Sequence, residues 1–223
     1  MKPFEELRSL LLVGSIILLT GCGGGASNAA TNPTSTLTAS LATLAALTPA
    51  ETGTLLFVRE EEKMARDVYL TLYDRWGLQV FQNIALRSEQ QHMDSIKLLI
   101  DNLGLADPVV SDAVGSFTNP DIAALYAQLV NRGLVSLDEA LAVGSFIEEF
   151  DINDLQEAID EAMDGTNQLP VIQIYTNLMC GSRNHLRAFV GQIESTGDNY
   201  VAQVIDQQTV DLIADSSPEQ CAQ

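Results

Sequence analysis

The chain contains two histidines, and each lies in a segment whose residue spacing could support metal chemistry. Glu89 and His92 form a Glu-x-x-His unit, and this separation places both side chains on one face of a helix. The carboxylate of such a unit can bridge two cations while the imidazole binds one of them. The same spacing also occurs on solvated helix faces, so this unit alone leaves both interpretations open.

Acidic residues interrupt apolar stripes in two other segments. Glu62 is in register with apolar positions and with Tyr69, whereas Glu61 shares a neighbouring face, so the choice between the two acids is open. Glu148 interrupts a further stripe, and Asp151 follows one turn later. An acid on an apolar stripe needs a metal ion, a proton or a cation beside it, because an unpaired buried carboxylate is costly. The alternatives are a solvated charge run around Glu61 and Glu62 and a partly exposed helix edge at Glu148 and Asp151.

The second histidine, His185, shares a helical face with Leu178, Ser182 and Phe189. A lone histidine on such a face is more often a hydrogen-bonded core residue than a ligand. His185 and His92 nevertheless fall in equivalent regions of two long helical segments. We therefore expect them to converge with the acids in the middle of one bundle.

The segments that carry these residues have helical periodicity. Long helices are expected over residues 49–76, 80–103, 137–163 and 170–195. Thr48 to Glu51 and Ser136 to Glu139 are capping-box sequences that begin two of them. Between the second and third helices, residues 105–132 contain glycine and proline breaks and a short helix. This order predicts an all-α fold, a four-helix bundle with a long crossover containing a short helix.

The charge of the chain excludes one class of partner. Its formal net charge is -19, from 11 Lys and Arg residues against 30 Asp and Glu residues. Such a surface repels phosphates, so we do not expect nucleic-acid binding.

The N-terminus indicates secretion. Lys2 and Arg8 precede the apolar run of residues 10–19, which is too short for a comfortable membrane span and ends in Leu-Thr-Gly-Cys22. This order resembles the lipobox of bacterial lipoproteins and predicts a lipid on Cys22, which would tether the protein to a membrane of the cell envelope, outside the cytoplasm. The alternative is a buried apolar helix followed by an ordinary cysteine.

The predicted organisation has four parts: a signal peptide over residues 1–21, a flexible tether over 22–47, a helical domain over 48–200, and a C-terminal strap with a weak helix over 201–223. Cys180 and Cys221 could pair in an oxidising compartment. Because Cys221 lies in a segment without strong structural signals, the pairing is left open.

The candidate residues together resemble the metal motifs of rubrerythrins, which belong to the ferritin-like superfamily. The resemblance is carried by Glu62-x-x-Ala65-Arg66-Asp67-x-Tyr69, Glu89-x-x-His92-Met93-Asp94, Glu148-x-x-Asp151 and His185. Residues 181–189, Gly-Ser-Arg-Asn-His-Leu-Arg-Ala-Phe, are still more similar to an uncharacterised ferritin-like family, a domain of unknown function. The likeness extends over about residues 48–200.

The resemblance implies an iron site of two ions or one, with manganese or zinc as other candidates. Glu62, Glu89 and Glu148 would supply oxygen ligands, with Glu89 as the bridge, and His92 and His185 would bind one ion each. Tyr69 would line the site as a catalytic residue or would only pack there.

One position departs from the rubrerythrin pattern. Ser182 stands where a glutamate is expected, and serine is a poor bridge between cations, so Asp151 becomes the alternative ligand. The chain also lacks a Cys-rich electron-transfer module. The implied function is an oxidoreductase acting on peroxide or dioxygen. The alternatives are a metal-storage module without turnover and a structural envelope lipoprotein without metal. Assembly into a homodimer is left open.

Overall fold

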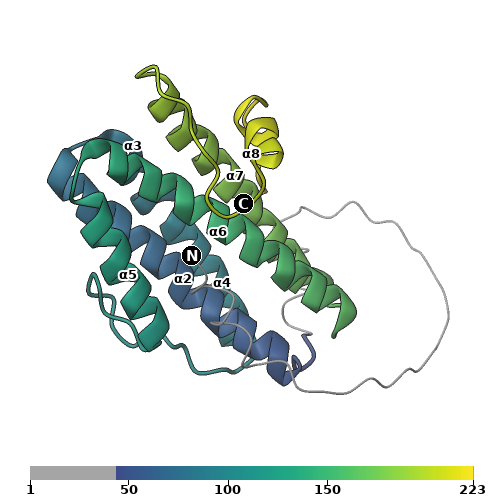
Figure 1. Ribbon diagram of the computed structural model, residues 1–223. Coiled ribbons are helices and arrows are strands. Elements are labelled where there is room, and N and C mark those ends of the chain that lie inside the picture. Colours follow the sequence, from purple (N-terminus) through teal and green to yellow (C-terminus); the bar gives the residue numbers. More distant parts are fainter. Residues whose placement is uncertain (1–43, 223) are drawn as a thin grey trace.

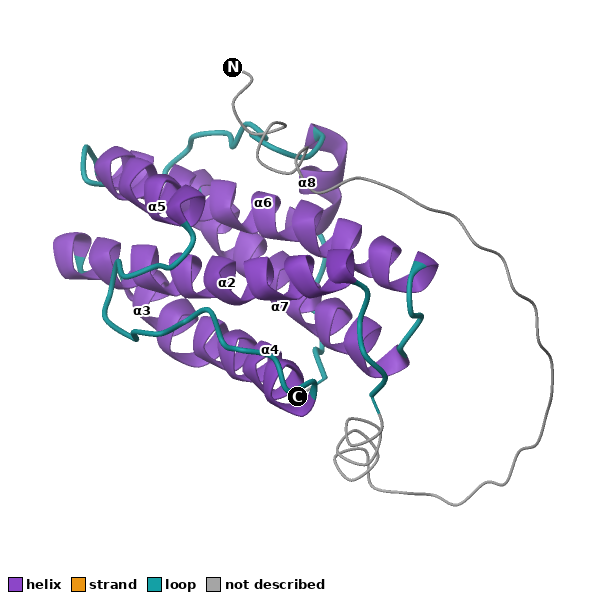
Figure 2. Cartoon of the chain, turned by 90° about the horizontal axis from the view of Figure 1, so that it is seen from below, coloured by secondary structure: helices purple, strands orange, loops and turns teal. Residues whose placement is uncertain are grey.

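The computed structural model describes residues 44–222, and within this range every regular element is a helix. Four long helical segments run side by side (Figures 1 and 2). They are α2 (Pro49–Trp76), the composite α3 (Gln79–Asn83), η1 (Ile84–Glu89) and α4 (Gln90–Asn102), then α6 (Leu137–Asp164) and α7 (Leu169–Glu194). The predicted all-α bundle is confirmed. The predicted signal peptide, Cys22 and most of the tether lie outside the described residues.

Two shorter helices flank the bundle. The long crossover after α4 contains α5 (Pro120–Gly133), which packs against α2 and α6 (Figure 2). The C-terminal segment contains α8 (Gln207–Ala214), which packs against α7 (Figure 1). Both were expected from the sequence. No helix between residues 44 and 222 has the length and apolar character needed to cross a membrane.

Both predicted capping sequences begin helices, but only the first forms both hydrogen bonds of a capping box. Thr48 accepts a hydrogen bond from the backbone N–H of Glu51, whose carboxylate accepts one from Thr48 N at 2.8 Å, so this capping box is complete. Ser136 accepts from Glu139 N at 3.1 Å, but the Glu139 carboxylate pairs with Arg132 Nε at 2.7 Å. The second box is therefore half formed, because a nearby guanidinium binds its carboxylate.

The apolar core is divided into two main clusters, one toward each end of the bundle. The first cluster includes Phe81 and Phe189, and the second includes Leu55 and Ile100. Along every long segment, the candidate ligands fall between residues of the first cluster and residues of the second. The bundle therefore has a polar layer at its middle, enclosed by apolar layers that exclude water.

The charge run over residues 59–63 of α2 is buried, so the interpretation as a solvated face is wrong. The crossover covers Arg59, Glu60 and Lys63 of this run, whereas Glu62 faces His92 of α4. Glu60 accepts hydrogen bonds from Asn119 N at 2.9 Å and from a neighbouring backbone N–H. Lys63 Nζ lies 2.5 Å from Asp67 Oδ2 and donates a hydrogen bond to the backbone carbonyl of Ala113 in the crossover. Periodicity within one helix could not show this, because the covering chain comes from residues far along the sequence.

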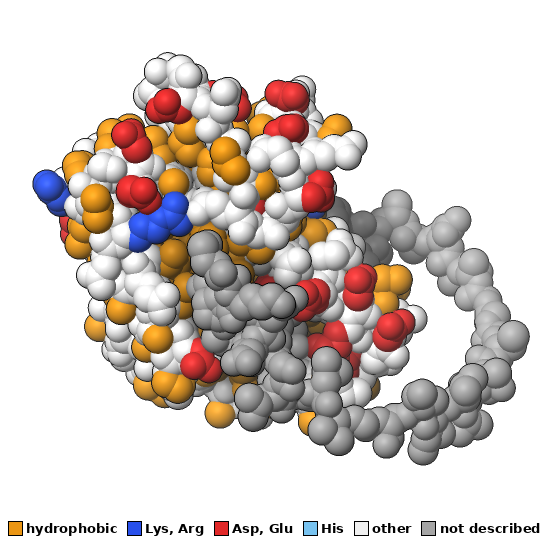
Figure 3. Space-filling model, viewed as in Figure 1, with side chains coloured by type: hydrophobic (Ala, Val, Ile, Leu, Met, Phe, Trp, Pro, Cys, Tyr) orange, Lys and Arg blue, Asp and Glu red, His pale blue; other side chains and the backbone are white. Residues whose placement is uncertain are grey.

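Hydrogen bonds and a disulfide hold the C-terminal segment against the bundle. The buried Glu149 carboxylate accepts backbone hydrogen bonds from Gln203, Val204 and Ile205, at distances from 2.6 to 3.1 Å. Cys180 and Cys221 form a disulfide with a sulfur–sulfur distance of 2.06 Å. The pairing that the sequence left open is therefore present, since the segment returns along α7. Acidic side chains are scattered over the surface (Figure 3), as the composition predicts.

Candidate metal centre

The polar middle layer brings together all six predicted ligands. They are Glu62 from α2, Glu89 at the end of η1, His92 from α4, Glu148 and Asp151 from α6, and His185 from α7. Each is buried, with 2–7% of its surface exposed. The convergence of residues from four separate helical segments was the central expectation from the sequence.

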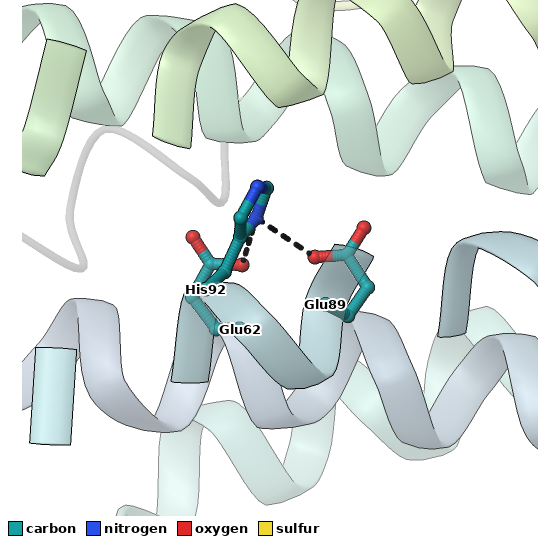
Figure 4. Close-up of side chains that lie close together, drawn as sticks. All are labelled: Glu62, Glu89 and His92. Atoms are coloured by element: carbon teal, nitrogen blue, oxygen red, sulfur yellow. Dashed lines mark hydrogen bonds and ion pairs between the residues drawn. The ribbon is translucent and has the colours of Figure 1, made fainter. Parts of the chain in front are cut away.

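Glu89 lies between the two imidazoles. Its Oε2 is 3.2 Å from His92 Nδ1 and its Oε1 is 3.0 Å from His185 Nδ1. His92 Nδ1 is also 3.0 Å from Glu62 Oε2 (Figure 4), and His185 Nδ1 is 3.2 Å from Glu148 Oε2. The two rings are stacked, with centroids 5.6 Å apart.

Two groups of potential metal ligands result, and both contain Glu89. One comprises Glu62, Glu89 and His92, and the other comprises Glu89, Glu148 and His185; within each, the ligand atoms lie within 4.8 Å of one another. A carboxylate with one oxygen directed toward each group has the arrangement of a bridge between two cations. The geometry also separates the two candidate acids of α2, because Glu62 belongs to a group and Glu61 does not.

A π-helical turn, absent from the sequence prediction, positions Glu89. Residues Ile84–Glu89 form η1, and Gln90 N donates to Ala85 O across five residues. The wider turn shifts the register before Glu89, so that Ile84, Ala85 and Glu89 all face the interior. The sequence has no glycine or proline there, and its periodicity fits one continuous helix.

Two carboxylate oxygens in this layer lack the partners that burial demands. Glu62 Oε1 and Asp151 Oδ1 are buried and accept no hydrogen bond among the described residues. An unsatisfied buried acceptor costs about 1–3 kcal/mol, and more when it is charged. A cation between the carboxylates would satisfy both atoms, so the donor set fits a metal ion.

A hydrogen bond from α7 orients Asp151. The Ser182 hydroxyl donates a hydrogen bond to its Oδ2. Burial and the negative charges of Glu62 and Glu148 raise the pKa of Asp151 well above its ordinary value. Ser182 therefore orients a carboxylate from α6 in the region where the rubrerythrin pattern has a glutamate on α7.

Tyr69 contacts the centre through Glu148. Its hydroxyl donates to Glu148 Oε1, and its ring packs against Phe189, with centroids 5.3 Å apart. The packing role and the hydrogen-bonding role were alternatives in the sequence, and Tyr69 has both. Burial, and then the charge of Glu148, raise the pKa of Tyr69 well above 10, so the phenol keeps its proton and positions the carboxylate.

Replacing Tyr69 with phenylalanine tests this positioning role. The ring stays in the core, and Glu148 loses one hydrogen bond. For a metal ion held by the Glu148 group, we expect about tenfold weaker binding, because a partner that orients a ligand typically contributes 10–100-fold. Chelator competition measures the two affinities, and equal weakening at both groups would contradict the role.

The ionisable groups of the centre shift one another's pKa values. Burial raises the pKa of Glu62 to about 7 despite the opposing effect of His92. Burial disfavours the charged form of His185, but Glu148 and Glu89 outweigh it and raise its pKa to about 10. Burial also acts to raise the pKa of Glu89, but the two imidazoles hold it below its ordinary value. The raised pKa values of the histidines and of the acids Glu62, Glu148 and Asp151 therefore both reduce the net negative charge of this layer.

The fold and this layer define a class: an all-α bundle protein with a buried cluster of carboxylates and imidazoles at its middle. The chain belongs to the family described as an uncharacterized protein domain, DUF2202, whose sequence profile matches residues 51–217. The similarity to an uncharacterised family is thereby confirmed.

A relative in Methanocaldococcus jannaschii, the uncharacterized protein MJ0754, is 47% identical over 165 residues, covering 74% of this chain and 86% of the relative. The chain is also similar to the crystal structure of hypothetical protein MJ0754 from Methanococcus jannaschii. The two structures superpose with a TM-score of 0.74 and 44% sequence identity, and the alignment covers 79% of this chain and 97% of the other.

Proposed function

We propose that the protein is a ferritin-like, rubrerythrin-like metalloprotein that binds two divalent first-row metal ions, iron foremost. Glu62 and His92 would hold one ion, Glu148 and His185 the other, and Glu89 would bridge them. The observation that carries this proposal is the Glu89 carboxylate, whose two oxygens are directed toward different histidines 3.0 and 3.2 Å away.

The donor chemistry selects the metal. Carboxylates and imidazoles suit iron, manganese and zinc, and neither group contains a thiolate, which would favour softer metals. Asp151, oriented by Ser182, would supply a further oxygen ligand in place of the missing glutamate.

The reaction class that we propose is oxidoreduction with peroxide or dioxygen. Bound iron or manganese would supply the electrons. The chain's own residues would hold the ions in a buried layer, and the Tyr69 hydroxyl would keep its proton beside Glu148. Metal binding without turnover is the second candidate, favoured by the serine at position 182.

Anaerobic loading with Fe(II), followed by elemental analysis, tests the metal proposal. We expect two ions per chain, one for each ligand group. Asp101→Ala is a matched control, because it removes an exposed acid from α4 and should change nothing. A chain that retains no ion under these conditions would leave only the structural role. Peroxide consumption by the loaded protein, with and without His185→Ala, separates turnover from storage.

Metal affinity should depend steeply on pH. Both histidines hold protons in the metal-free protein, because Glu148 and Glu89 raise the pKa of His185 to about 10 and the neighbouring acids raise that of His92 well above 6.5. A metal ion must displace these protons, so affinity rises with pH below that range. We expect the metal affinity to increase about tenfold per pH unit for each proton displaced. Calorimetry in buffers of different ionisation enthalpy counts the released protons, and a pH-independent affinity would be inconsistent with imidazole ligands.

We also propose that residues 1–21 are a signal peptide and that lipidated Cys22 anchors the protein to a membrane of the cell envelope. The order of charges, apolar run and cysteine supports this, and so does the Cys180–Cys221 disulfide, because such bonds persist mainly in oxidising compartments. A mass spectrum of the mature N-terminus without an acyl group would overturn it.

A further inference from the structure

A cleft of about 630 Å³ lies between α4 and α7, beside the last residues of the described chain. His92 and His185 both line it. None of the four carboxylates of the candidate centre does so. The two imidazoles therefore stand between the cleft and the carboxylates, and they are the part of the centre nearest to solvent on this side.

The ring of His92 lies between the carboxylates and the cleft. Its Nδ1 faces Glu62 and Glu89, whereas its Nε2 lies 3.5 Å from the hydroxyl of Ser88, a residue of the cleft lining. The ring thus contacts the acids with one edge and the cleft with the other.

Gly181 of α7 makes room for that ring. A Cβ at this position would lie 2.7 Å from His92 Cε1 and closer still to Nε2, too near for any side chain. The absence of a side chain allows the imidazole to lie at the boundary between the cleft and the centre. Gly181 lies inside α7, so no turn or helix end requires a glycine at this position.

The cleft lining has the chemistry of a path for cations. Its polar lining includes the acid Asp94 and the amides Gln91, Asn177 and Asn184, beside the apolar Leu98, Ile174 and Leu178. The Glu219 carboxylate also lines the cleft but is ion-paired with Arg183 and Arg187. Carboxylate and amide oxygens are ligands that hard divalent cations accept. With a net charge of -19 on the chain, a cleft of this lining concentrates cations.

We propose that the α4–α7 cleft is the route by which divalent metal ions enter and leave the centre, passing the His92 and His185 rings. This inference rests on the proposed metal-binding function and adds the path to it. The route predicts that a fixed positive charge in the cleft slows exchange without changing how many ions the centre holds at equilibrium.

Asn177→Arg provides the test. Asn177 is a partly exposed residue of the cleft lining and supplies no ligand to the centre. The rate of Co(II) uptake by the full chain is followed by absorbance, and release by transfer to a chelator. We expect both rates to fall by about tenfold or more, because a like charge in the cleft opposes cation entry. Final cobalt stoichiometry should equal that of the wild type.

Gln156→Arg is the matched control. It places the same charge on the exposed face of α6, and we expect less than about a twofold change in rate. Unchanged uptake in Asn177→Arg, or equal slowing in both variants, would overturn the route. Failure of the wild type to bind cobalt would instead overturn the metal-binding function, so the two failures are distinguishable.

Discussion

Replacing Glu89 with alanine is expected to abolish binding of both metal ions. Glu89 belongs to both ligand groups, with one oxygen 3.2 Å from His92 Nδ1 and the other 3.0 Å from His185 Nδ1. Loss of an orienting partner alone weakens metal affinity 10–100-fold, so loss of a shared ligand should weaken both ions by more than about a hundredfold. Elemental analysis after loading, with chelator competition, measures the effect.

The histidine variants provide the contrast. His92→Ala and His185→Ala should each remove one ion and leave the other, because each imidazole belongs to a single group. Asp101→Ala, an acid removed from the exposed side of α4, should retain both ions. Glu89→Ala with one ion still tightly bound would show that Glu89 is not the bridge.

Breaking the Cys180–Cys221 disulfide should produce the largest loss of stability. The bond closes a loop with a sequence separation of 41 residues. Chain-entropy theory assigns a cross-link of that span about 4 kcal/mol, because the unfolded chain regains the conformations that the bond excluded. Urea unfolding of Cys180→Ala/Cys221→Ala against the wild type measures the difference in the free energy of unfolding.

Reductant supplies the control for this prediction. A reductant should lower the free energy of unfolding of the wild type to that of the double variant, and it should leave the value of the double variant unchanged. The C-terminal segment remains attached through Glu149 and through the Glu219 ion pairs with Arg183 and Arg187, so the native bundle should persist in both. A loss below about 1 kcal/mol would show that the unfolded chain gains little freedom when the bond is cut.

Much of the candidate centre was predictable because its ligands repeat with the helix. Glu62, Glu148 and His185 each stand on an apolar stripe, and the buried face of a helix can be predicted from its period. The inward direction of Glu89 depends in addition on the π turn of η1. Glu61 and Glu62 show the limit of this argument. Both are buried, although adjacent positions on a helix point about 100° apart, so each faces a different part of the surrounding structure. Only the neighbouring α4 decides which of them meets His92.

The amino-acid sequence by itself determined the long helices, the complete cap at Thr48 and the set of acids and histidines that face inward, because local hydrogen bonding and helical periodicity depend on residues within a few turns. Tertiary structure alone decided the π turn before Glu89, the burial of the α2 charge run beneath the crossover, the Cys180–Cys221 bond and the cleft beside the two imidazoles. Each of these depends on contacts between residues distant in the chain, whose free energies are gained only when the helices pack together.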